Sequence, residues 1–263
     1  MTPGPDEVKA CCAAAYSRDA VALVLGDSYH PGGLALTRTL AGTLDLRPGD
    51  RVVDIASGPG TTARLLAAEY GVTVDGVDLG ADTIERARAA TAGAGLSGQV
   101  RFRLGDAERL PLPGASADAV VCECALCTFP DKETAVAEFA RVLRPGGRVG
   151  LTDVTVEPDR LPEELTTLSA WVSCVAGARP ADGYADLFEA AGFRVIRSEP
   201  HDDAIVAMAS QVDARIRVLR MAGEGRLAES GVDPDTVIRY VYLVRQAVAD
   251  GALGYSLLVA QKP

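Results

Sequence analysis

The chain has 263 residues, a formal net charge of −10 and an isoelectric point near 4.8. No basic block is available to neutralise phosphates, which argues against a nucleic acid or an anionic membrane surface and favours a small-molecule substrate. The N-terminal sequence has no leader pattern, and no stretch reaches the roughly 18 apolar residues of a membrane span. We therefore expect a cytoplasmic protein without a membrane partner, and we expect its six cysteines to be thiols rather than disulfides.

Residues 1–50 are predicted to form a helical lid ahead of the main domain. Helix-forming and apolar positions over residues 6–25 predict two short helices with a break near Ser17. Another helix is predicted over residues 34–44. The total length fits one elaborated α/β domain rather than two small ones.

A turn-rich loop over residues 26–33 separates these helices and carries Tyr29 and His30. One interpretation is an ordinary surface loop with a proline-glycine turn. The other is a cover over a bound ligand, in which Tyr16 or Tyr29 touches that ligand. The sequence leaves both interpretations open.

Residues 51–63 predict a strand, a tight turn and the start of a helix. The apolar run at 52–55 is typical of a buried strand, small residues fill the turn at 56–60, and Thr61 opens the helix. Glycines in such a turn let a ligand approach the backbone, and the helix start offers free N–H groups and a positive dipole end. These features indicate a pocket for a nucleotide-type ligand.

The turn does not fit the dinucleotide pattern G-x-G-x-x-G, because Thr61 stands where the third glycine belongs. The pattern D-x-A-x-G-P-G instead resembles motif I of the class I S-adenosylmethionine (SAM) dependent methyltransferases, although Ala56 stands where that family usually has a glycine. The resemblance implies that the motif holds the amino-acid end of SAM through Asp54, Ala56, Ser57, Gly58, Pro59 and Gly60.

An acidic residue ends the second predicted strand, over residues 72–77. Asp78 is well placed there to accept hydrogen bonds from both hydroxyls of a ribose, with Leu79 beside it. The alternative is a helix N-cap, although Asp82 is an equally good cap candidate. We favour the ribose role for Asp78.

A third strand is predicted over residues 100–104 and is followed by G-D-A-E-R-L-P. In the methyltransferase family, the acid after this strand reads the adenine amino group. The resemblance therefore implies that Asp106 contacts adenine, with Ala107 supplying backbone and Glu108 as the alternative acid. A loop aspartate at this place could also be a helix cap.

Strands and helices continue to alternate, which predicts a parallel sheet with helices on both faces. The resemblance implies a Rossmann-like, seven-stranded α/β methyltransferase fold whose last strand is antiparallel. The remaining predicted strands are 118–123, 148–154, 193–198 and 254–260, and the predicted helices are 132–143, 161–177 and 181–191.

The SAM-binding core is predicted to comprise residues 51–200 and 251–263. Residues 201–250 are predicted to be a helical insertion, with helices over 204–221 and 233–249. We expect this insertion to form a cap over the site or the surface of a homodimer.

The residues just after the fourth strand face the departing methyl group in this family. Here they are Cys122, Glu123, Cys124 and Cys127, and we expect Cys122 beside the cofactor. Strand alternation predicts Cys122 and Cys124 on one face of the sheet and Glu123 on the other. Methyl transfer from a sulfonium needs alignment, and a base only if the nucleophile carries a proton. The candidate bases are Glu123 and His30, for a small organic acceptor.

The pattern Cys-x-Cys-x-x-Cys suits a soft trivalent metalloid such as arsenic, which thiolates hold with its lone pair free to attack. At this point the chain resembles the arsenite methyltransferases, and the metalloid substrate would be held by Cys124 and Cys127 with help from Cys174. Buried core cysteines or a structural zinc site are the other interpretations. A non-catalytic metal or metalloid binder and an NAD-dependent oxidoreductase are the alternatives to a methyltransferase.

Overall fold

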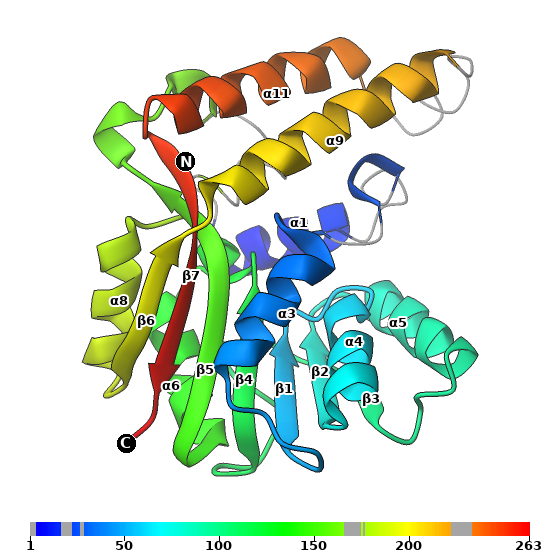
Figure 1. The fold of residues 1–263 in the computed structure, drawn as a ribbon, viewed down its shortest axis with the longest axis vertical. Helices are drawn as coiled ribbons and strands as arrows, with labels where there is room; N and C mark the ends of the chain where they lie inside the picture. Colours follow the sequence, from blue (N-terminus) through cyan, green and yellow to red (C-terminus); the bar gives the residue numbers. More distant parts are fainter. Residues whose placement is uncertain (1–3, 17–22, 27–28, 166–174, 176, 222–232) are drawn as a thin grey trace.

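The computed structural model describes residues 4–16, 23–26, 29–165, 175, 177–221 and 233–263. A seven-stranded sheet in the order β3-β2-β1-β4-β5-β7-β6 forms its centre (Figure 1). The strands are β1 (Arg51–Ile55), β2 (Thr73–Asp78), β3 (Val100–Leu104), β4 (Ala117–Glu123), β5 (Leu143–Val156), β6 (Arg194–Pro200) and β7 (Leu253–Gln261). This is the predicted Rossmann-like methyltransferase fold.

The strand order reverses at β1, which lies between β2 and β4. These strands are parallel, with Ile55 beside Val77 on one side and beside Cys122 on the other. β7 runs antiparallel to both β5 and β6, as predicted. Ligands of open α/β sheets bind where the strand order reverses, at the carboxyl ends of the strands.

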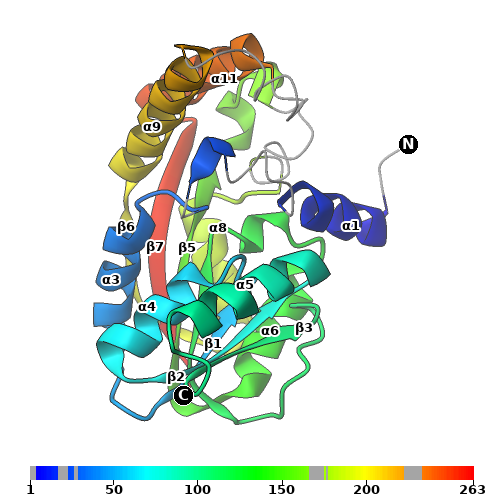
Figure 2. The same cartoon turned by 90° about the vertical axis from the view of Figure 1, so that its right-hand side faces the viewer.

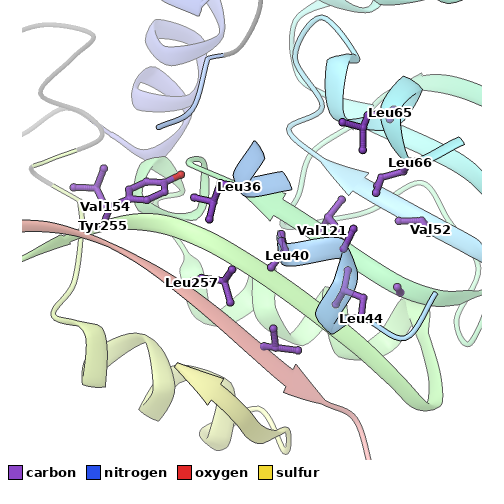
Figure 3. Packing of buried hydrophobic residues seen from close by; sticks show 14 of the residues in the cluster. Leu36, Leu40, Leu44, Val52, Leu65, Leu66, Val121, Val154, Tyr255 and Leu257 are labelled. Atoms are coloured by element: carbon purple, nitrogen blue, oxygen red, sulfur yellow. The ribbon is translucent and has the colours of Figure 1, made fainter. Parts of the chain in front are cut away.

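Helices cover both faces of the sheet. On one face lie α3 (Gly33–Thr43), α4 (Thr61–Tyr70) and α5 (Ala81–Gly93), and on the other lie α6 (Lys132–Val142) and α8 (Ala181–Ala190). Figure 3 shows how Leu36, Leu40 and Leu44 pack from α3 and its C-terminal end onto the sheet. Each is nearly fully buried, and burying a leucine contributes about 1.5–3 kcal/mol. The apolar face of α3 therefore fixes the segment that leads into it.

The boundary between α6 and β5 differs from the sequence-based expectation. The proline-glycine sequence at 145–147 was predicted to separate a helix from a strand, but β5 begins directly after α6. The reason is that Leu143 pairs with Ala117, and a register shift then lets Arg148 pair with Ala119. Gly146, with φ of 82°, lies within this irregular part of β5.

The predicted insertion is helical, with α9 (Asp202–Met221) and α11 (Pro234–Ala249) packed against each other at one end of the molecule (Figures 1 and 2). Helix α1 (Pro5–Tyr16) and a helical turn at 23–25 form the described part of the N-terminal segment. The predicted break at Ser17, and Trp171 and Cys174 of the predicted helix 161–177, lie outside the described residues; within that range, Glu163–Leu165 is a short 3-10 helix, η3. None of the described helices is long and apolar enough to cross a membrane.

Candidate functional site

The turn after β1 has left-handed backbone at Ala56, Gly58 and Gly60, with φ of 53°, 53° and 77°. A left-handed conformation costs a residue with a Cβ about 1–2 kcal/mol, so Ala56 is strained where the family usually has glycine. At Gly60, a Cβ would lie 2.3 Å from the ring of Phe102. Gly60 is also the N-cap of α4 and offers no side-chain acceptor to the first N–H groups of the helix. The turn thus brings backbone N–H donors to the end of β1.

Asp78, at the end of the neighbouring strand β2, is held by this turn. Its Oδ2 accepts a hydrogen bond from the N–H of Gly58 at 2.9 Å, and its Oδ1 accepts one from Gly80 at 2.8 Å. Burial raises the pKa of Asp78, and these backbone donors oppose the rise. Each carboxylate oxygen can accept a second hydrogen bond. Asp78 is therefore fixed in place and still able to accept hydrogen bonds from ligand hydroxyls.

Asp54 is a buried carboxyl beneath the turn, with 3% of its surface exposed. Its Oδ2 and the hydroxyl of Ser57 have no hydrogen-bond partner among the described residues. Burial raises the pKa of Asp54 well above its ordinary value, and Glu123 and Asp78 add to the rise. Unpartnered buried polar atoms are costly, so they mark places where a ligand belongs. A cationic, hydrogen-bonding group such as the ammonium of SAM fits beside Asp54.

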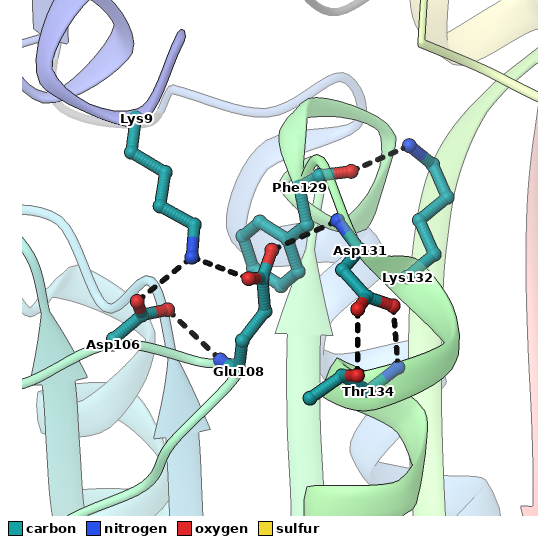
Figure 4. A network of polar contacts seen from close by, with 7 residues as sticks. All are labelled: Lys9, Asp106, Glu108, Phe129, Asp131, Lys132 and Thr134. Carbon is teal, nitrogen blue, oxygen red and sulfur yellow. Dashed lines mark hydrogen bonds and ion pairs between the residues drawn. The ribbon is translucent and has the colours of Figure 1, made fainter. Parts of the chain in front are cut away.

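A network of charges surrounds the loop after β3 (Figure 4). The ammonium of Lys9, on α1, donates to Asp106 Oδ2 at 2.8 Å and also to Glu108. Asp106 Oδ1 accepts from the N–H of Glu108, and Glu108 Oε1 accepts from the N–H of Asp131, both at 2.9 Å. These contacts connect α1 to the loop for which the family resemblance implies contact with adenine.

A second polar cluster gathers around Glu123, at the end of β4. The hydroxyl of Thr62 donates to Glu123 Oε2 at 2.6 Å, and that of Thr37 lies 3.1 Å from both carboxylate oxygens. His30 Nε2 lies 3.6 Å from Glu123 Oε2. The Glu123 and His30 side chains are 4% and 9% exposed. The structure therefore brings together the two candidate bases, which are distant in sequence.

The orientation of the His30 ring is set by its other nitrogen. Nδ1 lies 3.2 Å from the carbonyl oxygen of Pro31. Because a carbonyl oxygen only accepts, this contact places a proton on Nδ1 and leaves Nε2 as the basic nitrogen of the neutral ring. Nε2 also lies 3.4 Å from the hydroxyl of Thr37.

The cysteines are arranged differently from the prediction. Cys122 is fully buried against the α6 and α8 layer, whereas Cys124 packs with the core on the opposite face. Alternation fails because β4 ends at Glu123 and Cys124 is left-handed, with φ of 53°. Glu123 and Cys124 consequently both line the cavity, and Cys122 does not. Burial raises the pKa of the Cys122 thiol well above its ordinary value.

Cys127 is 1% exposed and lies outside the cavity lining. Its backbone N–H donates to Asp153 at 2.9 Å, and its carbonyl accepts from the buried ammonium of Lys132 at 3.0 Å. Cys174 lies outside the described residues. Within the described part of the chain, no group of three or more histidine, cysteine or acidic side chains could hold a metal ion.

One cavity joins these features. It is lined by the predicted site residues Tyr16, Tyr29, His30, Asp54, Ala56, Ser57, Gly58, Pro59, Asp78, Leu79, Asp106, Ala107, Glu123 and Cys124. Gly60 and Glu108, like Cys122 and Cys127, are not among its lining residues.

Sequence reasoning missed further lining residues, namely Lys9, Cys12, Ala13, Thr61, Thr62, Val77, Thr83, Gly105, Ala125, Thr128 and Phe129. Thr61 and Thr62 were identifiable as the first turn of the helix after the glycine loop. Lys9 is the one basic residue of α1, but nothing in the local pattern shows which surface Lys9 or Cys12 contacts.

Comparison with known proteins agrees with this geometry. Residues 53–151 match a family model described as a methyltransferase domain. The chain is 33% identical over 190 residues to nocamycin O-methyltransferase of Saccharothrix syringae. This alignment covers 64% of the chain and 67% of the relative. It is 34% identical over 162 residues to an arsenite methyltransferase of Halobacterium salinarum. This alignment covers 60% of the chain but only 41% of that relative.

The solved structure of the cyclopropane synthase MmaA2 from Mycobacterium tuberculosis has the same fold. It superposes with a TM-score of 0.83 at 18% identity and covers 100% of this chain and 99% of its own. The chain spans less than two thirds of several curated relatives, including 62% of methyltransferase GfsG of Streptomyces halstedii. The fold, the matched domain and these relatives together show that the chain belongs to the class I SAM-dependent methyltransferases.

Proposed function

We propose that this protein transfers the methyl group of SAM to a small organic acceptor that carries an ionisable proton. The observation that carries the proposal is a cavity whose lining contains both Asp54, with its unpartnered Oδ2, and the His30–Glu123 pair. SAM bound beside Asp54 would face an acceptor that the His30–Glu123 pair deprotonates.

The donor side would be formed by three carboxylates at the ends of successive strands. Asp54 would bind the ammonium of SAM, Asp78 its ribose hydroxyls, and Asp106 with Ala107 its adenine. SAM supplies an electrophilic methyl group on a sulfonium. The protein's part is to align that group with the acceptor and to exclude water.

The acceptor side would use His30 as the general base. With the proton held on Nδ1 by the carbonyl of Pro31, Nε2, which also lies 3.4 Å from the hydroxyl of Thr37, would accept the proton that the acceptor loses. Glu123, held by Thr37 and Thr62, then stabilises the resulting imidazolium.

The test compares His30→Gln with His201→Gln, which changes the other histidine of the chain. Candidate phenols, enols and carboxylic acids are screened by S-adenosylhomocysteine formation. We expect His30→Gln to lower kcat by about 10²–10⁴-fold and to leave SAM affinity unchanged. His201→Gln should retain turnover. Full activity of His30→Gln with every accepted compound would exclude the base.

A trivalent metalloid such as arsenic, held by thiolates, is the second candidate acceptor. It is supported by Cys124 in the cavity wall and by the relative named arsenite methyltransferase. The test measures S-adenosylhomocysteine and methylated arsenic in reactions that contain SAM and a thiol reductant, with and without arsenite. If the metalloid is the acceptor, both products form only with arsenite, and Cys124→Ser abolishes them, whereas Cys127→Ser, outside the cavity lining, is the comparison. Unchanged arsenic methylation in Cys124→Ser would exclude thiolate capture by Cys124.

A further inference from the structure

We propose that the helical insertion positions the base: the surface of α9 and α11 holds the segment at 23–26, and Val24 and Gly26 are positioning residues for His30. The proposal rests on the function assigned to His30 above. In this proposal, the insertion positions the base of the active site in the same chain.

The first observation is the apolar contact of Val24. This side chain is 6% exposed and belongs to a cluster whose other buried members all come from the insertion: Ala209, Val212, Ile216 and Val241. Leu25 packs against the same cluster. Figure 1 shows this short blue turn beside α9. A residue near the start of the chain is thus buried by residues near its end.

The second observation is the close approach of α9 to Gly26. Gly26 has φ of 85°, and a Cβ there would lie 2.1 Å from the guanidinium of Arg215. Arg215 also donates to the carbonyl oxygen of Val24 at 3.5 Å. The left-handed backbone favours glycine here, and a Cβ would force the guanidinium of Arg215 to move. The contact therefore holds Gly26 against α9.

The third observation is that the chain is fixed again directly after His30. Pro31 is buried, and Gly32, with φ of 79°, leads into α3 against Leu36. Tyr29 and His30 lie between these two attachments and line the cavity. A shift at Val24 or Gly26 would therefore change the position of the imidazole relative to Glu123, whereas no residue of α4 or of the glycine turn belongs to the cluster around Val24.

The test uses the full-length protein with Val24→Ala and Gly26→Ala, and Val218→Ala as the matched control. Val218 lies on α9 but is 62% exposed. The chain has only two histidines, so the imidazole resonances of His30 and His201 are assigned in an NMR spectrum with His201→Gln. Circular dichroism verifies that each variant is folded before its spectrum is interpreted.

We expect Val24→Ala and Gly26→Ala to shift or broaden the His30 resonance, and Val218→Ala to leave it unchanged. Turnover in the first two should fall on the order of tenfold in kcat, with SAM affinity unchanged, because misplacing a base affects only the chemical step. Val24→Ile keeps the apolar contact, so its His30 resonance and its kcat should match those of the wild type.

An unmoved His30 resonance in folded Val24→Ala and Gly26→Ala would overturn the proposal, since α3 alone would then fix the loop. The NMR readout does not depend on catalysis. If the resonance moves but His30→Gln turns over normally, the positioning is supported and the role of His30 as base is refuted.

Discussion

The ammonium of Lys9 lies 2.8 Å from Asp106 Oδ2 and joins the first helix of the chain to the loop after β3. The Lys9 side chain is only 16% exposed and also donates to Glu108. Burial lowers the pKa of Lys9, but the hydrogen bonds to Asp106 and Glu108 outweigh this effect and raise it above its ordinary value. Lys9 therefore stays charged and attaches α1, which contributes to the cavity wall, to the expected adenine site.

Removing this charge should loosen α1. Lys9→Met keeps the apolar stem but loses both ion pairs, so we expect SAM to dissociate severalfold faster, as measured by stopped-flow fluorescence. Arg38→Met is the control, because it removes an ion pair with Glu69 on the exposed surface. Equal dissociation rates in the wild type and Lys9→Met would show that α1 does not retain the cofactor.

Asp78→Ala should weaken SAM binding by about 1–3 kcal/mol, the range for a lost hydrogen bond to a charged group. Isothermal titration calorimetry measures this change. The control is Asp75→Ala on the same strand, where the carboxylate pairs with Arg103. If Asp78→Ala binds SAM as the wild type does, Asp78 does not contact the ribose.

Asp54 should make the SAM-free protein lose stability as pH rises. Its pKa is raised in the folded state, so the neutral carboxyl stabilises the fold fully below the unfolded value of about 3.9, and this stabilisation is lost as pH rises toward the folded pKa. Asp54→Asn removes this dependence. At neutral pH we expect the variant without SAM to be more stable than the wild type and to bind SAM more weakly.

Urea unfolding of both proteins without SAM, from about pH 4 to 8, measures the difference in stability. The two curves should diverge as pH increases. Parallel curves would mean that Asp54 titrates equally in the folded and unfolded states.

Ala56→Gly should stabilise the protein without SAM by about 1 kcal/mol, because glycine tolerates the left-handed backbone at this position. Ala115 has a similar φ of 49° but is absent from the cavity lining, so Ala115→Gly is the matched comparison. Both variants should gain stability in urea unfolding, and only Ala56→Gly should alter SAM affinity. Lower stability of both would contradict the argument from backbone strain.

The predictable parts of the site were those encoded by short segments. The strand, turn and helix around Asp54 follow from local apolar pattern and glycine spacing, and the ends of parallel strands bring Asp78 and Asp106 to the same edge. The face of Cys124 was predicted wrongly, because strand alternation holds only while the strand continues and β4 ends at Glu123.

Contacts between distant segments were not predictable from local pattern. Thr37 meets Glu123 only after α3 packs on the sheet, and Lys9 reaches Asp106 across 97 positions of sequence. Periodicity shows that a helix has an apolar face, but it does not identify the surface that this face contacts. For the same reason, the sequence left the insertion as either a cap or a dimer surface.

The burial of Val24 by α9 and α11 has a consequence for biosynthesis. The guanidinium of Arg215 contacts a carbonyl that precedes it by 191 residues, so the two partners leave the ribosome far apart in time. Residues 23–26 cannot reach their final place until the insertion has been synthesised and has folded. The segment that is made among the first is therefore placed among the last, in the same late stage of synthesis that adds β7 between β5 and β6.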